Sequence, residues 1–156
     1  MLLPASLEWP HVIVGALLLT YIPHLMLRVP AVHLKLAADK KKAAVKGAPS
    51  GYDIRAPREA QAAAVDDSEE GRYISRLNGQ HSNSHEAFPI ICASIFTALY
   101  RGVSVPHINE VATIWLASRV VHTLLYVYGA SKVVGGLRGI VWVFGLGCCS
   151  YLILAK

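Results

Sequence analysis

The chain has 156 residues, 54% of them hydrophobic, and a formal net charge of +5. Its mean hydropathy of +0.42 and its long apolar blocks exclude an ordinary soluble domain and are typical of membrane-spanning helices. Length predicts one domain, residues 1–156. The three cysteines lie in apolar segments without a CxxC pattern, so no extracellular disulfide framework is expected.

Four apolar segments predict an all-α fold, a four-helix transmembrane bundle. The expected spans are residues 7–34, 73–100, 107–129 and 133–155. Each is long enough to cross a hydrocarbon core of about 30 Å, which takes about 20 residues. The first segment has no basic n-region and no suitably placed small-residue cleavage site, which favours a retained span over a removed signal peptide.

The first segment contains two prolines, Pro23 and Pro30. Each lacks a backbone donor, so the carbonyls of Leu19 and Met26 lose their helical partners, and neighbouring helices are expected to satisfy them. His24 and Arg28 lie one turn apart just after the first kink. They either face a polar interior or extend toward the membrane edge as long amphipathic side chains do.

Residues 35–71 form a polar, lysine-rich loop. Four spans place this loop and the link between the third and fourth spans on one side of the membrane. That side carries most of the Lys and Arg residues, so the positive-inside rule predicts that the loop is cytoplasmic and both termini lie on the opposite side. The lysines are expected to face lipid headgroups, because no base-reading pattern accompanies them to indicate nucleic acid.

A first polar cluster opens the second segment. Arg76, Asn83 and Glu86 lie near one helical stripe, with Gln80 between them. Ionisable groups at such a depth are costly in lipid, so they usually face protein or a water-filled cavity and serve a function.

A second cluster lies in the third segment, where Arg119, His122 and Tyr126 share one helical face, and Arg138 opens the fourth segment. The topology lets both clusters meet in the cytoplasmic half of a bundle. The excess of arginine suits an anionic ligand with a carboxylate. Glu86 then either binds an ammonium group of the ligand or pairs with an arginine in an internal ion-pair network.

A metal site is the competing chemical interpretation. His81 and His85 are spaced i, i+4 and can chelate, with Glu86 or His122 as a further ligand. No HExxH pattern and no multi-histidine cluster supports this interpretation, so no metal is predicted.

The same residues resemble the MAPEG superfamily, the membrane-associated proteins in eicosanoid and glutathione metabolism, over nearly the whole chain. The matching patterns are His81-Ser-Asn-Ser-His-Glu86 with Pro89, the Arg119, His122 and Tyr126 spacing, Arg138 at the start of the fourth helix, and Gly51-Tyr-Asp-Ile-Arg-Ala-Pro-Arg58. The last of these and Glu86-Ala-Phe-Pro89 are closest to the small bacterial and fungal branch.

This resemblance implies a homotrimer with glutathione as cofactor, bound between subunits near the cytoplasmic face, and a hydrophobic substrate that enters from the membrane lipids. The implied glutathione-binding residues are Arg76, Asn83, Glu86, Arg119, His122, Tyr126 and Arg138. Arg138, which stabilises the thiolate, and Tyr126 are the implied catalytic residues. The implied location is the endoplasmic reticulum or another intracellular membrane in a eukaryote, or the inner membrane in a bacterium.

Two positions depart from the family pattern. Gly79 and Ser82 stand where family members often carry arginines, so two glutathione contacts are missing or supplied elsewhere, with Arg28 and Arg72 as candidates. The main hypothesis is a glutathione-dependent transferase or peroxidase acting on lipophilic electrophiles. The alternative is a glutathione-independent protein that binds a lipid or a partner, or isomerises a hydrophobic metabolite.

Overall fold

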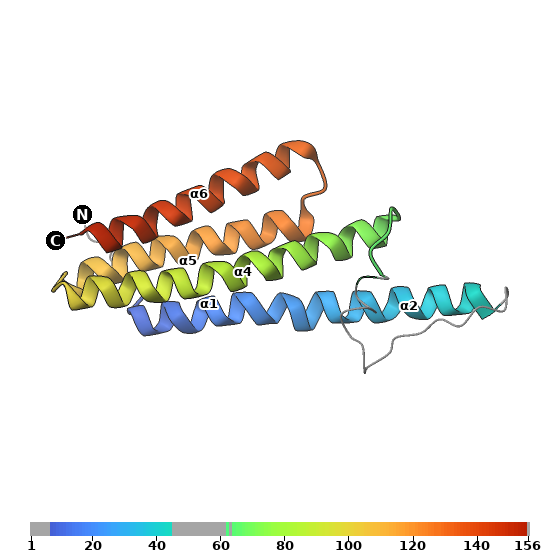
Figure 1. Cartoon of the computed structure of the whole chain (residues 1–156), viewed down its shortest axis with the longest axis horizontal. Coiled ribbons are helices and arrows are strands. Elements are labelled where there is room, and N and C mark those ends of the chain that lie inside the picture. Colours follow the sequence, from blue (N-terminus) through green and yellow to red (C-terminus); the bar gives the residue numbers. More distant parts are fainter. Residues whose placement is uncertain (1–6, 45–61, 63, 156) are drawn as a thin grey trace. The chain divides into compact units, whose positions relative to one another are not determined.

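The computed structural model describes residues 7–44, 62 and 64–155, which are almost entirely helical and contain no strand (Figure 1). The elements are α1 (Trp9–Pro23), the π-helix η1 (His24–Arg28), α2 (Val29–Ala44), α4 (Glu69–Tyr100), α5 (Val105–Tyr128) and α6 (Lys132–Leu154). The predicted all-α class is therefore confirmed. The chain divides into two compact units, one made of Met1–Tyr21 with Gln80–Lys156 and the other of Ile22–Gly79.

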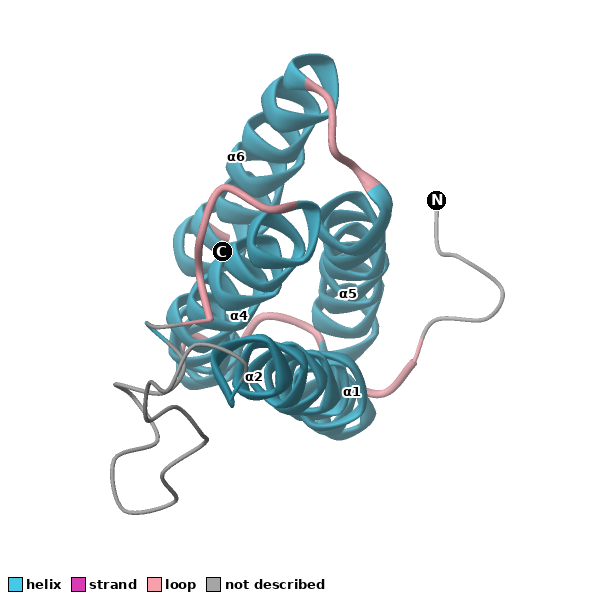
Figure 2. Ribbon diagram, turned by 90° about the vertical axis from the view of Figure 1, so that its right-hand side faces the viewer, coloured by secondary structure: helices cyan, strands magenta, loops and turns pink. Residues whose placement is uncertain are grey.

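The first unit is held together by one hydrophobic core to which four helices contribute. Its buried residues include Val12 of α1, Ile91 and Ile95 of α4, Trp115 of α5 and Leu152 of α6. Helices α5 and α6 pack directly on each other and are joined by a short loop (Figure 2). These contacts make the unit a helical bundle.

Gln80 satisfies a backbone carbonyl that Pro23 leaves without a helical partner. Its Nε2 donates to the carbonyl oxygen of Leu19 at 3.1 Å, and the Gln80 side chain is fully buried. The next carbonyl, of Thr20, accepts a hydrogen bond from Nδ1 of His81 at 3.1 Å. The expectation that a neighbouring helix would satisfy the carbonyl of Leu19 is confirmed, with α4 as that neighbour.

In the second unit, Arg28 is bound within the protein. Its Nη1 donates to Nδ1 of His24 at 2.7 Å, and its Nε donates to Oδ1 of Asn78. The π-helical turn His24–Arg28 follows Pro23 directly, where a local change of helical register is most easily accommodated. Of the two interpretations of Arg28, the polar contact inside the protein is the one observed.

The helix ends differ from the expected boundaries of the polar loop. The first apolar run ends near Leu34, but α2 continues to Ala44, and α4 already begins at Glu69. All of residues 35–44 except Asp39 are Ala, Leu or Lys, which are strong helix formers, so the helix continues beyond its apolar stretch. The lysine and arginine positions Lys46, Arg55 and Arg58, and the whole Gly51–Arg58 motif, lie outside the described residues.

Within the described residues, three helices are long and apolar enough to cross a membrane by length and composition: Trp9–Lys41, Val105–Tyr128 and Lys132–Leu154. Helix α4 has 32 residues but does not belong to this set. Its uncharged apolar run begins only after Glu86. The protein is an integral membrane protein, while a fourth crossing by α4 and the cytoplasmic side of the loop stay predictions.

A polar network ties α2 to the start of α4 in the second unit. Nζ of Lys35 lies 2.7 Å from Oδ2 of Asp66 and 3.5 Å from Oδ2 of Asp39. The hydroxyl of Ser68 accepts a hydrogen bond from the backbone N–H of Gly71 at 3.0 Å and so caps the first turn of α4. The hydrogen bond from Lys35, followed by those from Ser68, lowers the pKa of Asp66 from 3.8 to about 2.

Asp66 therefore makes the second unit sensitive to acid. Because its pKa is depressed in the folded state, its contribution to stability is complete above pH 3.8 and is lost as the pH falls toward 2. We expect Asp66→Asn to lower the melting temperature at pH 5 and to flatten its dependence on pH between 4 and 2. The neighbouring Asp67→Asn is the matched control, because no described residue pairs with that carboxylate. Equal acid profiles for the two variants would contradict the assignment.

Candidate functional site

An open cleft of about 470 Å³ lies in the first unit. Three helices line it with residues that the sequence singled out: Asn83 from α4, His122 and Tyr126 from α5, and Arg138 from α6. Residues far apart in the sequence thus converge on one space, which is what a binding site requires.

Tyr126 connects the polar groups of the cleft. Its hydroxyl oxygen accepts a hydrogen bond from Nδ2 of Asn83 at 2.8 Å, and its ring centroid lies 5.1 Å from that of His122. The guanidinium carbon of Arg138 lies 4.4 Å from the Tyr126 ring centroid, in cation–π geometry. The tyrosine therefore orients an amide on one side and a cation on the other.

Arg119 is a buried cation one helical turn before His122. Only 7% of its surface is exposed, and its Nη2 donates to the carbonyl oxygen of Val141 at 2.9 Å. Its guanidinium carbon lies 5.7 Å from the Trp115 ring centroid. Nε of Arg119 has no hydrogen-bond partner among the described residues. Arg119 does not line the cleft but borders a smaller cavity of about 50 Å³.

Glu86 borders the same small cavity as Arg119, and its side chain is exposed. In the described part of the chain, every salt bridge involves Lys35, so no cation pairs with Glu86. An internal ion pair between Glu86 and an arginine is therefore absent from the described protomer. Val141 supplies the acceptor for Arg119 instead.

Arg76 belongs to the other compact unit and is not among the residues that line the cleft. Its guanidinium carbon lies 5.5 Å from the Tyr73 ring centroid. Arg28 and Arg72 were the candidates to supply the contacts that Gly79 and Ser82 cannot make. Arg28 instead binds His24 and Asn78. Arg72 donates a hydrogen bond to the backbone carbonyl of Asp67. Neither lines the cleft.

Three residues that line the cleft were not predicted from the sequence: Gly135, Gly139 and Trp142. Together with Arg138 they recur at helical spacing on one face of α6, so the signal was present once Arg138 had been placed in the site. Trp142 also borders the small cavity beside Arg119. The two spaces thus share one aromatic wall.

No group of three metal-binding side chains occurs in the part of the chain that the structure describes. The rings of His81 and His85 do lie close together, with centroids 4.5 Å apart, but Nδ1 of His81 is bound to the carbonyl of Thr20. The described geometry gives no support to the competing metal interpretation.

The fold and cleft define a helical membrane protein with a polar site between its helices. A family model, the MAPEG family, matches residues 12–155, and the chain belongs to this family. It is thus a membrane protein of the superfamily of eicosanoid and glutathione metabolism. No significant match was found among curated proteins or among solved structures.

Gly145 makes room for Arg119. A Cβ atom at this position would overlap Nη2 of Arg119 and lie 2.8 Å from its guanidinium carbon. We expect Gly145→Ala to displace Arg119 and to lower the free energy of unfolding by about 1–3 kcal/mol, the usual cost of overpacking. Gly147→Ala is the matched control, because a Cβ there would meet no heavy atom within 4 Å. Thermal unfolding of both variants in detergent measures the difference, and equal melting temperatures would contradict the close contact.

Proposed function

We propose that the protein binds glutathione in the cleft lined by Asn83, His122, Tyr126 and Arg138 and uses its thiolate against lipophilic electrophiles. The observation that carries this proposal is the convergence of these four side chains, from three helices, on one open space of about 470 Å³. Membership of the MAPEG family supports glutathione as the ligand class.

The charge of the site fits this ligand. Glutathione carries two carboxylates and one ammonium group and is therefore anionic overall, and Arg138 gives the cleft lining a positive charge that attracts it. Glu86 is exposed and lacks a described cation, so it is available to an ammonium group. The hydroxyl of Tyr126 already accepts from Asn83, which leaves its O–H to donate to a peptide carbonyl.

Arg138 and Tyr126 are the proposed catalytic residues. A cation beside the sulfur lowers the pKa of the glutathione thiol and raises its nucleophilic fraction. In a substitution on a halonitrobenzene, the thiolate forms a carbon–sulfur bond, the carbon–halogen bond breaks, and halide leaves. The thiol proton goes to water. Tyr126 orients Arg138 through the cation–π contact.

A homotrimer is the proposed assembly, with the ligand bound between subunits. MAPEG proteins are typically trimeric, and membership of this family is what supports the assembly.

The variant Arg138→Ala separates catalysis from binding. We expect turnover with a halonitrobenzene to fall about tenfold or more, the loss of thiolate that follows a rise of about one in the thiol pKa. Glutathione affinity should change much less, whereas Asn83→Ala should mainly weaken binding. Lys132→Ala removes an exposed cation at the start of the same helix, outside the cleft, and is the control. Wild-type protein that binds no glutathione at millimolar concentration would sink the proposal.

Glu86→Gln tests the role of the carboxylate. No described cation depends on Glu86, so we expect cross-linking in mild detergent to give the same trimer as the wild type. Glutathione affinity should fall about tenfold, the cost of one charge-assisted hydrogen bond. Loss of the trimer instead would show that Glu86 pairs with an arginine of a neighbouring subunit. A wild-type protein that runs only as a monomer would contradict the assembly.

A further inference from the structure

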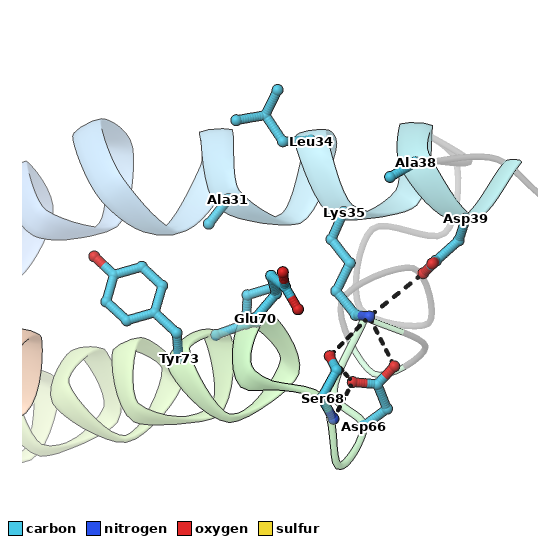
Figure 3. A pocket seen from close by; sticks show the side chains of 10 residues that line it. Ala31, Leu34, Lys35, Ala38, Asp39, Asp66, Ser68, Glu70 and Tyr73 are labelled. Atoms are coloured by element: carbon cyan, nitrogen blue, oxygen red, sulfur yellow. Dashed lines mark hydrogen bonds and ion pairs between the residues drawn. The ribbon is translucent and has the colours of Figure 1, made fainter. Parts of the chain in front are cut away.

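A second cavity, of about 480 Å³, lies inside the unit Ile22–Gly79 and shares no residue with the cleft. Helix α2 and the start of α4 border it (Figure 3). Ala31, Ala38 and Ile74 give it apolar walls, and Ile74 is fully buried. The space can therefore hold an apolar chain.

The polar lining of this cavity is acidic. Among the described residues that line it, Asp39, Asp66 and Glu70 carry three carboxylates and Lys35 carries the one ammonium. The charge of the described lining is therefore negative, whereas the whole chain has a net charge of +5. A negatively charged lining suits a cation better than a carboxylate or phosphate ligand.

Lys35 is already fully engaged. Its Nζ donates to Oδ2 of Asp66 at 2.7 Å and to the hydroxyl of Ser68 at 3.3 Å, and it pairs with Asp39 at 3.5 Å. An ammonium group has three donors, and three acceptors surround it. Lys35 therefore neutralises Asp66 and Asp39 in part and has no donor left for a ligand.

The Glu70 carboxylate and the Tyr73 hydroxyl are the polar groups of the described lining that remain for a ligand, whereas the Tyr73 ring already has the Arg76 guanidinium carbon 5.5 Å from its centroid. Both side chains extend from α4 toward α2 in Figure 3, and neither has a hydrogen bond or ion pair to any described residue. A carboxylate beside a hydroxyl is a favourable setting for an ammonium group, which donates to both. A metal ion fits poorly, because the described residues hold no group of three metal-binding side chains.

We propose that this cavity binds a cationic amphiphile, an alkylammonium compound. Its ammonium group lies between the Glu70 carboxylate and the Tyr73 hydroxyl, and its alkyl chain lies against Ala31, Ala38 and Ile74. The site is independent of the proposed glutathione chemistry, since the two share no residue.

The test uses n-octylamine, which is protonated at neutral pH, and n-octanoate, which has the same chain length and the opposite charge. Full-length protein in phosphatidylcholine nanodiscs is dialysed to equilibrium against each labelled probe, and empty nanodiscs give the background. We expect octylamine to bind above background and octanoate not to bind. Glu70→Gln should weaken octylamine binding about tenfold, as the loss of one charge-assisted hydrogen bond predicts.

The matched control is Glu69→Gln, which removes the same charge one residue earlier, outside the cavity lining. It should leave octylamine affinity unchanged. Ala38→Leu, which fills the apolar wall, should also weaken binding, and melting temperatures check that each variant is folded. The proposal is overturned by wild-type protein without octylamine binding, by equal affinity for octanoate, or by equal losses in the Glu69 and Glu70 variants.

Discussion

The buried guanidinium of Arg119 is the constraint on which the site depends. A cation with 7% exposure inside an apolar bundle is stable only if protein groups replace its water. The carbonyl of Val141 and the ring of Trp115 do so in part, and Gly145 leaves the space that the side chain occupies. These contacts fix α5 against α6. Because His122 and Tyr126 follow on the same face of α5, the contact that accommodates Arg119 also sets them opposite Arg138.

The same requirement, that a polar group in an apolar helix needs a partner, organises the contact between α1 and α4. Pro23 removes one helical hydrogen bond, and the carbonyl of Leu19 accepts from Gln80 instead. A side-chain donor is strong enough to hold a helix pair where water is absent. A kink in one helix and a fully buried amide in the other are therefore two parts of one interaction.

The features that depend on helical periodicity were predicted from the sequence. A contact whose partner is a backbone carbonyl was not. Helical spacing placed Arg119, His122 and Tyr126 on one face, and four of the seven predicted binding residues line the cleft. The partner of Arg119 was not foreseen, because a carbonyl such as that of Val141 leaves no trace in residue identity. Charge alone indicated a pair between Glu86 and one of the arginines as one of two possible roles of Glu86. The end of α2 was misplaced for a related reason: a drop in hydropathy marks the limit of apolar burial, whereas helix propensity continues to Ala44.

The described lining of the cleft is positively charged, and that of the second cavity is negatively charged. The difference follows from how the cation in each lining is bound. In the cleft, Arg138 rests on a neutral aromatic ring, which stabilises the cation without neutralising it, so its charge stays available to an anion. In the second cavity, Lys35 is bound directly to two carboxylates, so its positive charge is not available to a ligand and the described lining keeps an excess of negative charge. The two proposed ligand preferences therefore follow from how many charges each described lining leaves uncompensated. The net charge of the chain, +5, predicts neither of them.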